Sequence, residues 1–175
     1  MEVMSDGSKE ITMEKPIFYF EKFNTWDVIS IISYLLISII VYFQCTLSDF
    51  GIVHMYAFIT QFFLITFNYK SLRNLSVYFV WLVIGGIHLF VYFKLIDLPD
   101  LVGTHDHSVK DLKNTLIILG YYQVIRFISA RTQGQEWVCP GGSFRYDFFD
   151  NRKITIIDKV LTGSYFALFF ILLFN

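Results

Sequence analysis

Long apolar stretches recur along this chain of 175 residues, with few charged side chains inside them. Each has roughly 20 residues, the length at which an α-helix crosses the hydrocarbon core of a bilayer. A soluble domain this short could not bury several such stretches in one core. Barrel strands are excluded because they run about ten residues and alternate polar with apolar side chains. Since lipid offers the backbone no hydrogen-bond partners, we expect every stretch to be α-helical.

Five such stretches are separated by short, more polar connections. They cover residues 26–45, 51–69, 75–96, 112–130 and 154–175. The fourth is the least apolar because Gln123 and Arg126 interrupt it, and four crossings would remain if it lay in the membrane surface. The predicted fold class is an all-α integral membrane protein. It is a bundle of four or five transmembrane helices, four within residues 26–130 and the last at residues 154–175.

Residues 1–25 carry charges of both signs and precede the first apolar stretch. Phe18, Phe20 and Phe23 lie near lysines here, a combination that suits the headgroup layer of a bilayer. Two interpretations are open: a short amphipathic helix in the membrane interface, or aromatic side chains that pad the neighbouring helices. We therefore expect a short interfacial segment on the cytoplasmic side.

Residues 131–153 are rich in aromatic and basic side chains and contain the turn sequence CPGGS. They predict a short cytoplasmic hairpin or interfacial loop in which Trp137 dips toward lipid or a second subunit. The basic side chains would face anionic headgroups or a cytoplasmic protein partner: Arg131, Arg145, Arg152 and Lys153. Nucleic acid is not favoured as a partner, because the chain has a net charge of −1 and acidic residues are interleaved in the loop.

The distribution of basic residues predicts the orientation in the membrane. The N-terminal region and the second and fourth connections carry three, two and four lysines or arginines, whereas the first and third connections carry none and three. Because basic loops stay on the cytoplasmic side, we expect a cytoplasmic N-terminus and a multi-pass protein of the inner or plasma membrane.

Three residues in the middle of the third stretch stand out. The pair Gly85–Gly86 predicts a kink or the close approach of a neighbouring helix. His88 is an ionisable side chain at mid-membrane depth, which points to a pore, a proton relay or a buried hydrogen bond. The alternative is a neutral histidine bonded to a serine, threonine or tyrosine of another helix.

The fourth and fifth stretches also carry polar side chains. Gln123 and Arg126 share roughly one face of the fourth, and a polar face inside a membrane usually meets protein or water. Asp158, near the start of the fifth, lies at a depth comparable to that of Arg126. An ion pair between these two residues, or two separately solvated helix ends, are both consistent with the sequence.

The third connection contains His105 and His107 on either side of an aspartate. Such a pair can bind zinc or another divalent metal when a further ligand is near, and His54 is expected at the same membrane face. Without that third ligand, the segment is a solvated, pH-sensitive loop that holds no cofactor.

No group of residues combines a nucleophile, a base and an oxyanion stabiliser, so an enzyme is not favoured. We expect a small membrane protein that acts by assembly: a homo-oligomeric pore or channel lined by His88, Gln123 or Arg126, or an accessory effector. Two alternatives remain. One is a metal-dependent membrane enzyme that uses the outer-face histidines, and the other is a proton-coupled transporter subunit with His88 as the proton site.

Overall fold

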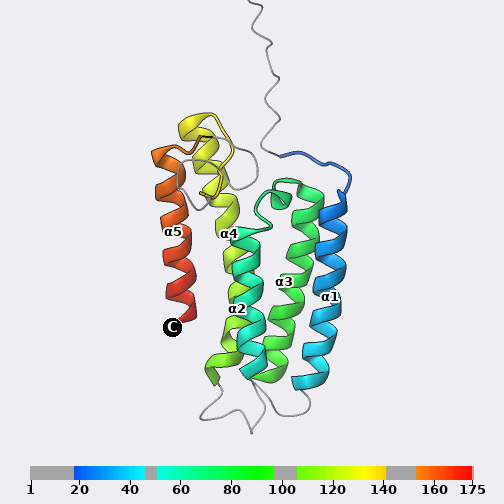
Figure 1. Ribbon diagram of the computed structural model, residues 1–175. Coiled ribbons are helices and arrows are strands. Elements are labelled where there is room, and N and C mark those ends of the chain that lie inside the picture. Colours follow the sequence, from blue (N-terminus) through cyan, green and yellow to red (C-terminus); the bar gives the residue numbers. More distant parts are fainter. Residues whose placement is uncertain (1–17, 46–50, 97–105, 141–152, 175) are drawn as a thin grey trace, which may run out of the picture.

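The computed structural model describes residues 18–45, 51–96, 106–140 and 153–174. These residues form five α-helices and one short 3-10 helix, and they contain no β-strand. The elements are α1 (Thr25–Cys45), α2 (Gly51–Thr66), η1 (Ser71–Arg73), α3 (Leu75–Leu95), α4 (Asp106–Gln133) and α5 (Ile156–Leu173). The all-helical fold class is confirmed. Successive helices run in alternating directions and lie side by side, with α1 and α5 on opposite sides of the bundle (Figure 1).

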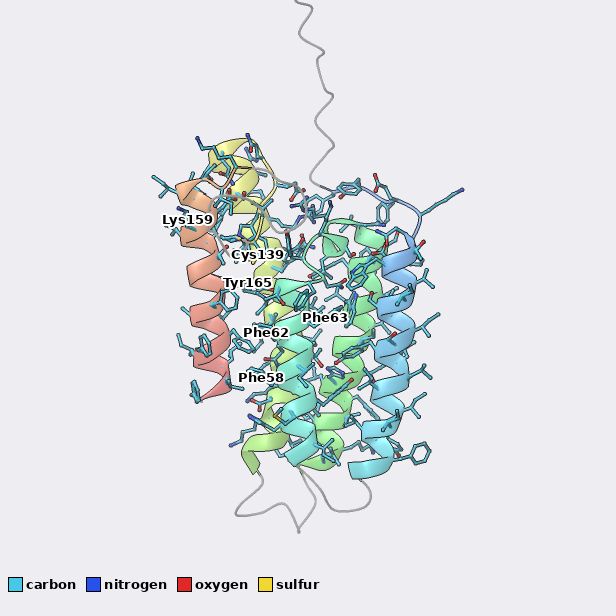
Figure 2. The ribbon with its side chains drawn as sticks, viewed as in Figure 1. Phe58, Phe62, Phe63, Cys139, Lys159 and Tyr165 are labelled. Atoms are coloured by element: carbon cyan, nitrogen blue, oxygen red, sulfur yellow. The ribbon has the colours of Figure 1, made fainter. Side chains whose placement is uncertain are left out.

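Three helices are long and apolar enough to cross a membrane: Thr25–Phe43, Leu75–Leu95 and Ile156–Leu173. They make the chain a multi-pass membrane protein. On α1, large apolar side chains project away from the bundle along the whole helix (Figure 2). Only a narrow stripe that includes Asp27, Ser30 and Tyr34 is buried against the other helices. Lipid covers an apolar surface of this extent without the cost it would have in water.

The central helix is α4, which packs against α2, α3 and α5. Between residues 111 and 130 its exposed side chains are apolar, among them Ile117, Val124 and Phe127, and five polar side chains are buried. The buried polar residues are Asp111, Asn114, Thr115, Arg126 and Ser129. This arrangement satisfies the polar groups inside protein and leaves apolar groups for lipid.

The observed helix ends refine the predicted spans. The helix α4 begins six residues earlier and ends three residues later than the predicted residues 112–130. It stops at Gly134, whose φ of 65° ends a helix at no steric cost. The helix α2 ends at Thr66, and a turn carries the chain on to Tyr69, which is fully buried.

Residues 18–24 are extended rather than helical, which excludes an interfacial helix there and corrects that alternative. They are held against the start of α3 by Asn74. The Asn74 side chain accepts from the Glu21 backbone at 3.1 Å and donates to the Glu21 carbonyl at 3.0 Å. It also accepts from Ser76 and so caps α3. One asparagine thus fixes both a helix start and the segment that leads into α1.

The glycine pair in α3 separates into two environments. A Cβ atom placed on Gly85 would lie 2.7 Å from Cδ2 of Leu116 on α4, whereas a Cβ on Gly86 would meet nothing within 4 Å. The close helix approach expected for this pair is therefore made by Gly85, and Gly86 is exposed.

This difference gives a matched pair of variants. Gly85→Leu should lower the free energy of unfolding in detergent micelles by about 1–3 kcal/mol relative to Gly86→Leu, because it forces α3 away from α4. The helix propensity change is the same in both variants and cancels. Equal stabilities would contradict the close contact between Gly85 and Leu116.

Candidate functional site

The imidazole of His88 lies in the middle of the bundle and is 4% exposed. Its Nε2 atom is 2.8 Å from the Tyr56 hydroxyl of α2, and its Nδ1 atom is 3.1 Å from the Thr115 hydroxyl of α4. The Tyr56 ring meets the imidazole edge-on, with 5.3 Å between the ring centroids. These contacts join α2, α3 and α4 at one point. The sequence left two interpretations of His88 open, and one of them was a histidine bonded to a serine, threonine or tyrosine of another helix. The contacts with Tyr56 and Thr115 are bonds of this kind.

The hydrogen-bonded chain continues to α1. The Tyr56 hydroxyl is also 2.6 Å from the Ser38 hydroxyl, and Tyr34 bonds Thr60 beside it. The Tyr34 and Tyr56 rings are stacked, with centroids 5.5 Å apart. The resulting line of side chains, Ser38–Tyr56–His88–Thr115, is called the His88 chain below. Each of its members can both donate and accept a hydrogen bond.

A second polar group occupies the bundle end where α2 and α4 begin. Nδ1 of His54 is 2.5 Å from Oδ2 of Asp111, and the two side chains are 40% and 6% exposed. Gln61 donates to the Asp111 carbonyl at 2.7 Å, and Asn114 donates to the Leu172 carbonyl of α5 at 3.0 Å. Sequence reasoning missed Asp111 as the partner of His54.

The predicted metal ligands are only partly accounted for. His105 lies outside the described residues, and of His107 only the helical backbone is described. Within the described part of the chain, no group of three or more histidine, cysteine, aspartate or glutamate side chains could hold a metal ion. His54 is instead placed against Asp111.

The opposite bundle end holds Arg126, which is fully buried. Its guanidinium donates twice to the Glu136 carboxylate, at 3.0 and 2.6 Å, and once to Gln123 at 3.2 Å. It also lies over the Tyr122 ring, 5.8 Å from the centroid. Two parallel bonds to one carboxylate form the strongest arrangement that an arginine makes in proteins. Glu136 is therefore a partner of Arg126 that the sequence interpretation, which considered Asp158, did not include.

Asp158 is fully buried and takes part in the start of α5. It forms a capping box with Thr155 and accepts from Gln133 of α4 at 2.9 Å. Gln133 also accepts from the Thr155 hydroxyl at 2.6 Å. Asp158 thus links the start of α5 to the end of α4 through Gln133.

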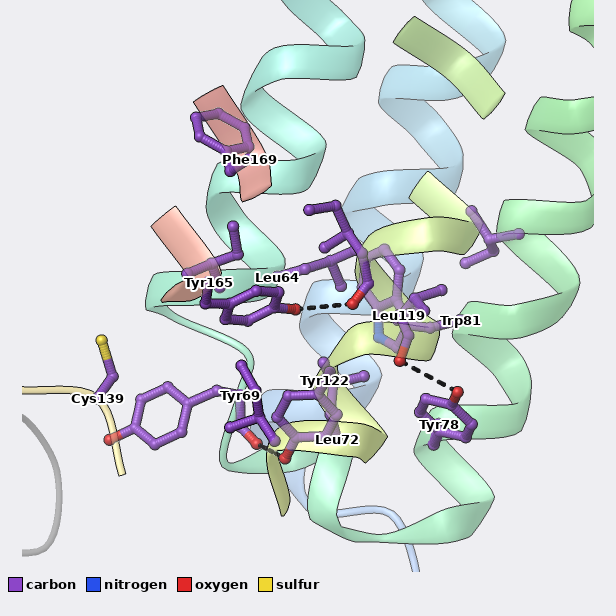
Figure 3. Packing of buried hydrophobic residues seen from close by; sticks show 14 of the residues in the cluster. Leu64, Tyr69, Leu72, Tyr78, Trp81, Leu119, Tyr122, Cys139, Tyr165 and Phe169 are labelled. Atoms are coloured by element: carbon purple, nitrogen blue, oxygen red, sulfur yellow. Dashed lines mark hydrogen bonds between the residues drawn. The ribbon is translucent and has the colours of Figure 1, made fainter. Parts of the chain in front are cut away.

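Trp137 differs from the prediction. Its side chain is fully buried inside this chain rather than turned toward lipid, and its indole donates to Thr162 of α5 at 3.2 Å. It packs edge-on against Tyr69, Tyr122 and Tyr165, with centroids 5.4–6.0 Å away. Figure 3 shows these three tyrosines together with Cys139, which is also buried. Residues 134–140 therefore fold back as a plug between α4, α5 and the α2–α3 connection.

The basic residues of the predicted surface loop are described in part. Arg131 is exposed and lies over the Phe127 ring at 5.3 Å, and Lys153 is exposed. Arg145 and Arg152 lie outside the described residues. Near this end, burial raises the pKa of the Tyr19 phenol above its usual value, although the positive charge of Arg73 acts in the opposite direction. Tyr19 is thus a neutral hydroxyl at physiological pH.

Comparisons with protein-family models, with curated proteins and with solved structures give no match to this chain. Its function is therefore inferred from its own residues and their contacts.

The buried ion pair can be tested by charge removal. Glu136→Gln should lower the free energy of unfolding by roughly 3 kcal/mol, because it leaves the Arg126 guanidinium buried without its counter-charge. Gln135→Ala changes an exposed side chain of the same loop and should have little effect. Unfolding in detergent micelles measures both, and equal losses would contradict a stabilising role for the ion pair.

Proposed function

We propose that this chain moves protons through the interior of its own helix bundle, as a multi-pass protein of the inner or plasma membrane. The observation that carries the proposal is the His88 chain, a continuous line of hydroxyl and imidazole groups across four helices at mid-membrane depth. A proton can pass along such a line because each member accepts a hydrogen bond on one side and donates on the other. Among its members, only imidazole has two ring nitrogens, so it can take a proton at one nitrogen and release one from the other.

A purely structural role would not need a histidine at this position. Apolar side chains of similar volume hold helices together at least as well, whereas a buried polar network is stable only when every member is bonded. An ionisable group at this depth is therefore a functional candidate by default.

The contacts of the predicted pore residues also favour a pathway inside one chain. His88, Gln123 and Arg126 all take hydrogen-bond partners within the bundle. A pore between copies would need such side chains on the outer surface of each subunit. The outer surfaces of α1 and α5 instead carry large apolar side chains, which suit lipid.

Three further buried residues, on α1, on α3 and in the turn after α2, carry polar atoms without a described partner. Among the described residues, no hydrogen bond reaches Nε1 of Trp81, Oδ1 of Asp27 or the side-chain amide of Asn68. Trp81 packs against Tyr34, with ring centroids 4.9 Å apart, and Tyr34 stacks on Tyr56 of the His88 chain. Buried groups of this kind are usually satisfied by ordered water, which would extend the pathway.

We also propose that all five helices cross the membrane and that the N-terminus is cytoplasmic. The polar side chains of α4 lower its hydropathy, but they face protein, and its lipid-facing residues are apolar. The 16 residues of α2 span about 24 Å, and the following turn to the buried Tyr69 adds to this length. In this layout, the basic residues on the N-terminal side satisfy the positive-inside rule.

The crossing of α4 can be measured by cysteine labelling in whole cells, in a background without Cys45 and Cys139. Lys94→Cys, at the end of α3, should react with a membrane-impermeant maleimide from outside. Gln135→Cys, just after α4, should react only after permeabilisation. Labelling of both positions from the same side would contradict the crossing, and an exchanged pattern would reverse the orientation.

Proton transfer can be measured in liposomes that contain the purified protein and a pH-sensitive dye. His88→Gln keeps hydrogen-bonding groups but cannot titrate, so acid-driven proton entry should fall on the order of a hundredfold. Tyr56→Phe removes one hydroxyl from the His88 chain and should lower entry in the same direction. Tyr42→Phe is the matched control, because Tyr42 is 61% exposed on α1 and does not belong to the His88 chain.

Wild-type protein that gives no more proton entry than empty liposomes would overturn the proposal. So would equal entry in the Tyr56→Phe and Tyr42→Phe variants, because the interior hydroxyl would then have no part in the transfer.

A further inference from the structure

The pair His54–Asp111 lies at the bundle end where α2 and α4 begin. Its short contact uses Nδ1 of the imidazole, which leaves Nε2 of this partly exposed ring available to water. Asp111 is almost fully buried behind it. A histidine oriented by a carboxylate is the arrangement in which imidazole exchanges protons efficiently, because the carboxylate fixes the ring and leaves its second nitrogen to the exchange partner.

Two buried amide oxygens adjoin this pair. Gln61 and Asn114 direct their nitrogens to carbonyl oxygens, as described above, and Asn114 also reaches Oδ1 of Asp111 at 3.4 Å. Their own oxygens, Oε1 and Oδ1, are buried and receive no hydrogen bond from the described residues. Acceptors in this position call for a donor such as water or hydronium.

The same residues lead to the His88 chain. Asp111 and Thr115 are four residues apart on α4, so their side chains lie on one helix face, one turn from each other. One water molecule could bridge a separation of this size. These residues would then lead from solvent at His54 through Asp111 to Thr115 and His88.

Other charges near this end come from α3 and α4. Among the residues whose side chains are described, they are Lys94, Lys110 and Lys113. The ammonium groups of Lys94 and Lys113 each lie 5.7 Å from the centroid of an aromatic ring, of Phe90 and Tyr92 respectively. The described ends of α1, α2 and α5 at this side carry no aspartate, glutamate, lysine or arginine. Asp106, the first residue of α4, is described by its backbone alone, and Asp111 is the carboxylate whose side chain contacts His54.

We infer that His54–Asp111 is the proton-exchange site of this membrane face, which loads protons from water onto the His88 chain. The inference rests on the proposed function, since an exchange site has a role only where a proton pathway follows it. It adds two residues to that pathway and assigns them distinct tasks. His54 exchanges protons with solvent through Nε2, and Asp111 positions the imidazole and receives its proton.

The test uses the full chain in liposomes and adds free imidazole as an external buffer. His54→Ala should reduce proton entry on the order of a hundredfold, and imidazole on the His54 side should restore most of it. His88→Ala should not be restored, because its site is closed to solvent. Met55→Ala is the matched control: Met55 neighbours His54, is 55% exposed and should transfer protons like the wild type.

Asp111→Asn, which preserves shape, should lose proton entry in the same direction as His54→Ala while the protein keeps its thermal unfolding temperature. Normal entry in His54→Ala would overturn the inference and leave the proposed function intact if His88→Gln is still inactive. A loss that imidazole does not restore would also overturn it, because the role of His54 would then be structural. Failure of the proposed function is distinct: the wild type itself gives no entry.

Discussion

Polar side chains on α4 cannot face lipid, and the rest of the bundle is arranged to cover them. The buried face of this helix carries an aspartate, an asparagine, a threonine, an arginine and a serine. Lipid would leave each without a hydrogen-bond partner, so α2, α3, α5 and residues 134–140 supply the partners. The helix least suited to a membrane by composition is therefore the one against which the other helices are positioned.

Apolar length was sufficient to predict four helices almost to their ends, because a backbone in lipid has no alternative to the helix. It was insufficient for α4. Gln123 and Arg126 made this stretch the least apolar, yet they bond to each other inside the protein, and hydropathy does not separate the two faces of a helix. The extended residues 18–24 were also beyond the sequence signal. Their conformation depends on Asn74, which is 53 residues distant from Glu21 in the chain.

The sequence predicted how deep the residues of the candidate site lie in the membrane, but it did not predict their hydrogen-bond partners. His88 stood out as an ionisable side chain at mid-span, yet its partners depend on which helices lie beside α3 and at what height. The same holds for His54 and Asp111, which are 57 residues apart. Trp137 was predicted at the membrane surface, where tryptophan is enriched, but it found a hydrogen-bond partner and three aromatic rings inside. The sequence did contain one signal for this burial. Glu136, next to Trp137, can supply the counter-charge that a buried arginine such as Arg126 needs.

The ionisable side chains at the two ends of the bundle differ in exposure and in pairing. This difference indicates the end at which protons would enter the proposed pathway. At one end, Arg126 is held by both oxygens of Glu136 and covered by the plug of residues 134–140, so its charge is fixed. At the other end, His54 is bonded through one nitrogen and two-fifths exposed. On the proposed pathway, protons would therefore exchange with water at the His54 end. At the Arg126 end the guanidinium keeps its proton, and the Glu136 carboxylate balances its charge.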